Sequence, residues 1–79
     1  MKSPLELEMR GDSMYERLQH LLEDYGEVQI RFDSGVDAEL HKHNTEFDEE
    51  PMVKVVTTGE ARWFNAEKIE EVWIHDEYL

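Results

Sequence analysis

Two histidines and a glutamate occupy every second position in the middle of the chain: Glu39, His41 and His43. In a β-strand all three side chains point to the same face, because side chains alternate between the two faces of a strand. Two imidazoles and a carboxylate at that spacing are suitable ligands for one zinc or nickel ion. The alternative is an ordinary solvent-facing strand surface. His75 would complete a metal site if the last strand lay beside this one.

A second candidate site combines basic and aromatic side chains, namely Arg31, Arg62, Phe64 and Trp73. The alternation of the strands that contain them predicts that all four lie on outward faces. Exposed rings beside basic groups stack the bases of single-stranded nucleic acid, at about 1–3 kcal/mol per base. Large exposed apolar side chains also mark protein contacts. We prefer a protein partner or a homo-oligomer, because a chain with a net charge of −12 repels phosphate.

Recognisable catalytic motifs are absent from the sequence. It has no glycine-rich phosphate loop, no nucleophile elbow and no cysteine. The 20 acidic residues bring some carboxylates together by their number alone, so a pair of carboxylates is no argument for acid–base catalysis. We therefore expect a non-catalytic protein without a cofactor.

The acidic residues extend along the whole chain, with 20 Asp and Glu against 8 Lys and Arg. Repulsion on that scale costs stability, and molar salt relieves it by shortening the Debye length to about 3 Å. The composition, with a pI near 4.5, resembles that of haloarchaeal proteins. We expect a protein of a halophilic archaeal cytoplasm. The alternative is an acidic mimic of DNA that occupies a DNA-binding partner.

The length of 79 residues leaves room for one domain with one core. Residues 1–12, which include Pro4 and Gly11, predict a flexible leader, and residues 13–79 predict a single small α+β domain. No apolar stretch approaches the roughly 20 residues of a membrane span, and no hydrophobic signal sequence opens the chain. We expect a cytoplasmic protein with no membrane partner.

A helix is predicted directly after the leader. Ser13 and Glu16 have the spacing of a capping box, and Gly26 stands where a left-handed residue ends a helix. Apolar residues recur between these signals at helical spacing: Met14, Leu18, Leu21, Leu22 and Tyr25. The sequence therefore predicts a helix over residues 13–25.

From Glu27 onward the apolar residues recur at every second position, which is the period of a strand. The predicted elements are strands at 27–32, 36–41, 52–57 and 60–64, a single helical turn at 65–68 and a last strand from Ile69. Gly59 is expected to have a positive φ in the tight turn of the second hairpin. Residues 44–51 interrupt the pattern and predict a loop from which Phe47 turns inward.

A helix followed by about five short strands, with a single helical turn before the last, is the order of elements in Sm-like and SH3-like small barrels. Residues 52–75 resemble these barrels most, because a hairpin, a short turn and an Ile-x-x-Val strand follow one another there. The resemblance covers residues 13–75. It implies an N-terminal helix packed on a strongly bent antiparallel sheet or on a small five-stranded barrel. The uridine-binding signature of Sm proteins and the proline-ligand groove of SH3 domains are missing, so no ligand residues are carried over.

Overall fold

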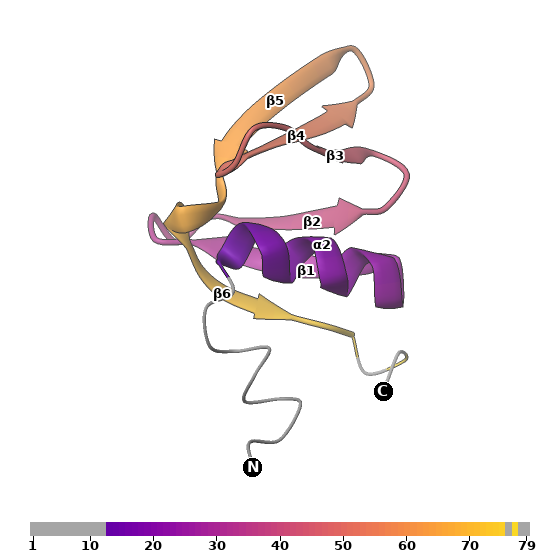
Figure 1. The fold of residues 1–79 in the computed structure, drawn as a ribbon, viewed down its shortest axis with the longest axis vertical. Helices are drawn as coiled ribbons and strands as arrows, with labels where there is room; N and C mark the ends of the chain where they lie inside the picture. Colours follow the sequence, from indigo (N-terminus) through magenta and orange to yellow (C-terminus); the bar gives the residue numbers. More distant parts are fainter. Residues whose placement is uncertain (1–12, 76, 78–79) are drawn as a thin grey trace.

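The computed structural model describes residues 13–75 and residue 77 (Figure 1). The predicted leader at residues 1–12 lies outside this described part. Within it, one α-helix is followed by two antiparallel sheets of three strands each, which confirms the α+β class. The elements are α2 (Met14–Tyr25), β1 (Glu27–Phe32), β2 (Asp37–His41), β3 (Thr45–Phe47), β4 (Met52–Thr57), β5 (Glu60–Asn65), the 3₁₀ turn η1 (Ala66–Lys68) and β6 (Ile69–Trp73).

Helix α2 begins and ends at the predicted signals. The Ser13 hydroxyl accepts a hydrogen bond from the Glu16 amide at 3.1 Å, and the Glu16 carboxylate accepts one from the Ser13 amide at 3.2 Å. Gly26 has a φ of +80°, and its amide donates to the carbonyl of Leu22. Leu18 and Leu22 are the buried residues of the helix, as its apolar stripe predicts.

The first sheet has the order β2-β1-β6, so β1 lies between two antiparallel neighbours. Val28 and Ile30 are fully buried on its inner face, and Glu27, Gln29 and Arg31, which alternate with them, are half-buried on the other face. Ile30 lies opposite Ala38 on one side and Val72 on the other. The predicted alternation of β1 is thereby confirmed.

The second sheet has the order β3-β4-β5, and the predicted hairpin turn at Thr58-Gly59 connects its last two strands. The chain reaches this sheet from β2 through a turn at residues 42–44. Asn44 stabilises that turn, because its side-chain oxygen accepts a hydrogen bond from the His41 amide at 3.1 Å. The backbone carbonyl of Asn44 accepts a hydrogen bond from the Val56 amide of β4 at 2.8 Å.

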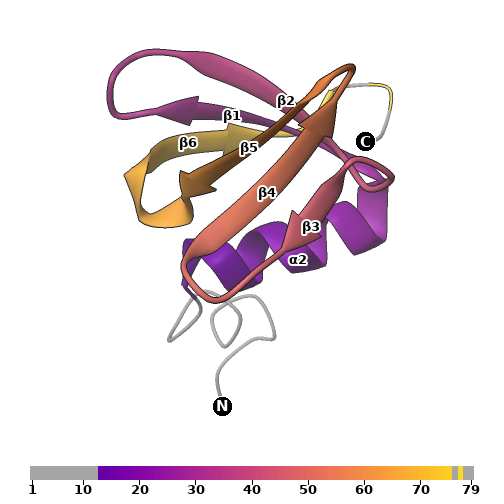
Figure 2. The ribbon, with the colours of Figure 1, turned by 90° about the horizontal axis from the view of Figure 1, so that it is seen from above.

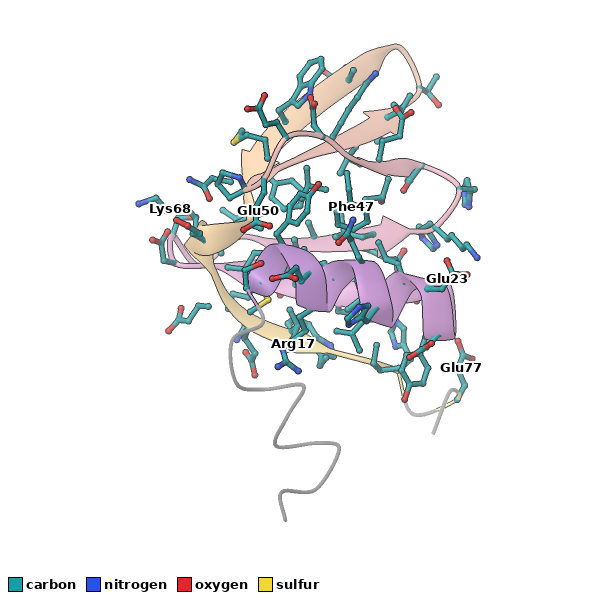
Figure 3. All side chains as sticks on the ribbon, in the orientation of Figure 1. Arg17, Glu23, Phe47, Glu50, Lys68 and Glu77 are labelled. Atoms are coloured by element: carbon teal, nitrogen blue, oxygen red, sulfur yellow. The ribbon has the colours of Figure 1, made fainter. Side chains whose placement is uncertain are left out.

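The prediction of a loop throughout residues 44–51 is wrong at Thr45–Phe47, which form β3. Thr45 is buried opposite Val55 of β4. Phe47 turns inward as predicted (Figure 3). Its ring meets the ring of Tyr15 edge-on, with 5.3 Å between centroids. The strand is too short for its alternation to show among the surrounding acidic residues, and its packing against β4 and α2 decides its structure.

The implied five-stranded barrel is not closed. Among the described residues, six strands form two separate sheets, and the second sheet crosses over the first (Figure 2). The physical reason is the turn at residues 42–44, which ends β2 before β3 begins, so that no strand continues from one sheet into the other.

One hydrophobic cluster lies between the helix and the inner faces of both sheets. Its buried members are Leu18, Leu22, Val28, Ile30, Leu40, Val53, Ala66 and Ile69. Helix α2 contacts β1 and η1. Among the described residues, no helix is long and apolar enough to cross a bilayer.

Gly59 has the predicted positive φ, at +78°, and nothing lies within 4 Å of the place where a Cβ would stand. A substitution there is opposed by backbone conformation alone and not by a clash. Gly59→Ala is expected to lower the free energy of unfolding by about 1 kcal/mol in chemical denaturation. The neighbouring Thr58→Ala serves as the control and should change it by less than about 0.5 kcal/mol. Equal losses in the two variants would contradict the role of this turn.

Candidate functional site

The outer face of the first sheet brings together most of the predicted site residues. The antiparallel register pairs Glu27 with His41, and it pairs Gln29 with both Glu39 and Trp73. Side chains on this face alternate with those that enter the core. Three strands thus present polar and charged groups side by side around Gln29.

A cluster of two carboxylates and two imidazoles lies at one end of this face. Nε2 of His41 is 3.0 Å from Oε2 of Glu39, and Nδ1 of His41 is 3.5 Å from Oε2 of Glu27. Nε2 of His75 is 3.2 Å from Oε1 of Glu27 and 3.7 Å from Oε1 of Glu39. We name these four residues the His–Glu cluster. Each of its carboxylates is in reach of both imidazoles.

The predicted ligand set of Glu39, His41 and His43 is assembled only in part. Glu39 and His41 belong to the cluster, but β2 ends at His41 and His43 lies in the turn that follows. The centroid of the His43 ring is 5.4 Å from that of His41, outside the cluster. The spacing argument fails at His43 because it requires the strand to continue.

Glu27 is the ligand candidate that sequence reasoning missed. The signal was present, because a hairpin closed by the turn after Phe32 places Glu27 across from His41. His75 enters the cluster because β6 pairs with β1, which is the condition on which its participation depended. The alternation of apolar and polar residues within one strand does not show which distant strand pairs with it, so the pairing of β1 with β6 could not be predicted from the sequence.

Glu39 is held in its ionised form. The side-chain amide of Gln29 donates a hydrogen bond to its carboxylate at 2.9 Å, and this bond, followed by the one with His41, lowers the pKa of Glu39. At neutral pH the group is therefore a carboxylate and available as an acceptor or a metal ligand.

Arg31 lies at the other end of the same face, where each of its three nitrogens donates a hydrogen bond to a carboxylate. Its Nε donates to Asp37 at 2.7 Å, its Nη1 donates to Glu71 at 3.0 Å, and its guanidinium lies 5.4 Å from the centre of the Trp73 ring. These contacts place two carboxylates against the guanidinium, which opposes the approach of a phosphate, and the guanidinium covers the half-buried Trp73. The two residues therefore form part of the sheet surface rather than an open binding platform.

The Arg31–Asp37 pair shifts both titrations. The hydrogen bond and the opposite charge raise the pKa of Arg31 and lower that of Asp37. The resulting stabilisation is present above the ordinary pKa of an aspartate and is lost as the pH falls through the lowered value. Both side chains are about half exposed, so solvent keeps the effect small.

The prediction that Phe64 faces outward is wrong. Phe64 lies opposite the buried Val53, packs against the core and meets the Phe32 ring edge-on at 5.2 Å between centroids. Its neighbour Trp63 takes the outward position and is 52% exposed. Because Trp63 and Phe64 are adjacent and both aromatic, the alternation fits equally well with either of them facing the core. Only the pairing of β5 with β4 decides between the two arrangements.

Arg62 shares the inner face with Phe64 but lies beyond the edge of the core. Its side chain is 76% exposed and pairs with Glu60 at 3.3 Å. An apolar cleft of about 380 Å³ opens beside it, between the β1–β2 hairpin and the β4–β5 hairpin. Phe32, Val55 and Phe64 lie in its lining. This cleft lies between strands of the two sheets that do not pair with each other.

Trp63 is the centre of a patch on the outer face of the second sheet. Its Nε1 donates to Asp48 at 3.0 Å, and Nζ of Lys54 lies 5.4 Å from the centre of its ring. Val56, on the same face, is 42% exposed. The patch thus offers an oriented aromatic ring with apolar surface beside it.

Comparison of the chain with protein families, with curated proteins and with solved structures finds no match.

Proposed function

We propose that the chain is a non-catalytic interaction module that associates with a second copy of itself through the free edge of β5. The observation that carries this proposal is the unpaired edge beside Trp63. Within the described residues β5 pairs only with β4. An unpaired edge offers a row of backbone donors and acceptors to another strand.

The direction of the backbone groups supports this contact. The Val56 amide donates to the turn before β3, so its backbone groups face away from β5. Backbone groups alternate along a strand, and Val55 therefore directs its own toward Arg62, its partner on β5. The residues on either side of Arg62 must then direct theirs outward. Ala61 and Trp63 thus present their N–H and C=O groups to the free edge.

A two-fold axis centred on Trp63 gives a favourable register for two such edges. Each Trp63 then lies opposite Trp63 of the second copy, and the two residues exchange a pair of backbone hydrogen bonds. Arg62 lies opposite Phe64 of the second copy, so like charges do not face each other. Two-fold dimers are the commonest symmetric assemblies. The pairing would also cover the exposed Trp63 ring and extend over the mouth of the apolar cleft.

The proposed dimer is weak and depends on salt. Pairing of two short edges buries less surface than the roughly 1,600 Å² of a standard interface. Each chain also carries a net charge of −12, and two such chains repel one another. Screening by KCl should therefore strengthen the dimer, whereas nucleic-acid binding weakens as salt rises. The direction of the salt effect therefore distinguishes self-association from the binding of nucleic acid.

Trp63→Glu is expected to abolish the dimer, because it removes the aromatic pair and places two carboxylates against each other. Sedimentation equilibrium over a range of concentrations in molar KCl should show the mass of the wild type rising above 9.4 kDa and that of the variant staying there. Tyr25→Glu is the matched control, since Tyr25 is also an exposed aromatic residue but belongs to α2 rather than to the second sheet. It should leave the dimer intact.

Ala61→Pro gives a second test that preserves the β5 surface. Proline removes the amide that faces the free edge, and proline is tolerated at such positions of an edge strand. The variant should keep its circular dichroism spectrum and lose the dimer. A wild type that stays at 9.4 kDa throughout would refute the proposal. Quenching of tryptophan fluorescence by single-stranded oligonucleotides in that monomer would favour nucleic-acid binding instead.

We also propose a cellular setting and a fold family for this module. The acidic surface fits a salt-rich, halophilic archaeal cytoplasm as the place of action, with DNA mimicry as the alternative explanation of the charge. The helix before the first strand and the 3₁₀ turn before the last support the resemblance to Sm-like and SH3-like barrels. A shared fold would leave the function to be decided by the surface of this chain.

A further inference from the structure

We propose that Glu27, Glu39, His41 and His75 form a binding site for a divalent transition-metal ion, with zinc as the first candidate. The four residues are the His–Glu cluster, on the outer face of the first sheet. The proposal is independent of the self-association, because β5 belongs to the second sheet. Its role would be structural, since four side chains leave no open coordination position.

The spacing of the ligand atoms fits one ion. Around a tetrahedral zinc ion with bonds of about 2.1 Å, neighbouring ligand atoms lie about 3.4 Å apart. One ligand atom each from Glu27, Glu39 and His41 lie within 4.8 Å of one another. His41 contacts Glu39 through Nε2, at 3.0 Å, and Glu27 through Nδ1, at 3.5 Å, so its ring must turn until one nitrogen faces both carboxylates before an ion can bind. Nε2 of His75 lies 3.2 Å from Glu27 and 3.7 Å from Glu39, and His75 is the candidate for the fourth ligand.

The charge of the cluster favours a cation at its centre. The side chain of Glu27 is only 15% exposed, and a carboxylate withdrawn from water is costly unless a positive charge compensates it. The carboxylate of Glu39 lies on the same face, within 3.0 Å of His41 and 3.7 Å of His75. A divalent ion would balance both carboxylates and use the imidazoles as neutral ligands.

The donor set also indicates the class of metal. Two imidazole nitrogens with two carboxylate oxygens suit zinc, nickel, copper or cobalt, whereas magnesium and calcium prefer shells made of oxygen alone. Gln29 occupies the position of a supporting residue, because it donates to Glu39 at 2.9 Å and to Glu27 at 3.2 Å. Hydrogen bonds of this kind orient carboxylate ligands toward a metal.

Metal binding would connect three strands through one ion. Glu27 belongs to β1, Glu39 and His41 belong to β2, and His75 follows β6. An ion that joins them stabilises the folded chain, because the unfolded chain lacks the assembled site. We therefore expect zinc to raise the melting temperature and to anchor the chain after β6.

Calorimetric titration of the full chain with zinc chloride is the decisive experiment. We expect one zinc ion per chain with a dissociation constant in the micromolar range or below, undisturbed by an excess of magnesium. Cobalt chloride should give the intense visible absorption of a tetrahedral site. Glu27→Gln and His41→Ala should each weaken binding at least about tenfold. Circular dichroism of the metal-free variants would show whether they fold.

His43→Ala is the matched control, because His43 follows the cluster in sequence but lies outside it. It should leave the zinc affinity and the cobalt spectrum unchanged, while His75→Ala weakens zinc binding. Equal losses in His41→Ala and His43→Ala would overturn the assignment of the ligands. Binding that magnesium displaces, or that folded Glu27→Gln and His41→Ala variants retain, would show nonspecific association with surface carboxylates and refute the site.

Discussion

Leu18→Ala is expected to lower the free energy of unfolding by about 2–5 kcal/mol. Leu18 is fully buried at the centre of the face that α2 turns to the core. Truncation removes buried apolar surface and leaves a cavity that its neighbours can fill only in part. A domain of this size has about 4–12 kcal/mol of stability in total. Chemical denaturation should therefore show a loss of a large fraction of the wild-type stability.

Leu21→Ala is the matched control for Leu18→Ala. Both substitutions replace leucine by alanine in the same helix, so the change in helix propensity cancels between them. Leu21 is only half-buried at the margin of the core. Its truncation should cost clearly less than that of Leu18. Equal losses would mean that the helix packs on the sheets through a different face.

Raising KCl from about 0.1 M to about 2 M is expected to raise the melting temperature by roughly 5 °C or more. Two effects of salt oppose each other. Screening weakens the exposed ion pairs of Arg31, Lys42, Lys54 and Arg62, but such pairs contribute only about 0–1 kcal/mol each. It also weakens the repulsion within a chain of net charge −12. Repulsion involves many more charges, so its relief should dominate.

The triple variant Glu49→Gln, Glu50→Gln and Glu67→Gln separates charge screening from other effects of salt. All three side chains are exposed. The variant should melt at a higher temperature than the wild type in low salt and respond less to KCl. A melting temperature of the wild type that stays level or falls across the range would remove the support for adaptation to high salt. An unchanged salt response in the variant would assign the effect to strengthened apolar burial instead.

Local sequence signals alone were sufficient to predict α2 and most of the strands. The capping box at Ser13, the glycine at Gly26 and the turn at Gly59 each require a particular residue type for reasons within a few residues of chain. The alternation of β1 places Val28 and Ile30 in the core on the same local grounds. These features were predictable because the determining contacts lie close together in the sequence.

The candidate surfaces depended on pairing between distant segments. Trp63 and Phe64 are equally suited to the core by type, and the register with β4 places Phe64 inside. Glu27 and His75 are far apart in the sequence, and they meet because β6 pairs with β1. No periodicity within one strand contains that information.

The sequence by itself determined the α+β class, the helix with both of its ends, the alternation of the longer strands and the acidity of the surface. Only the tertiary structure decided that β3 exists, that two sheets form in place of a closed barrel, and which side chains share an outer face. The physical reason is the range of the interactions. Capping and alternation act over a few residues, whereas the register between strands depends on how the whole core packs at once.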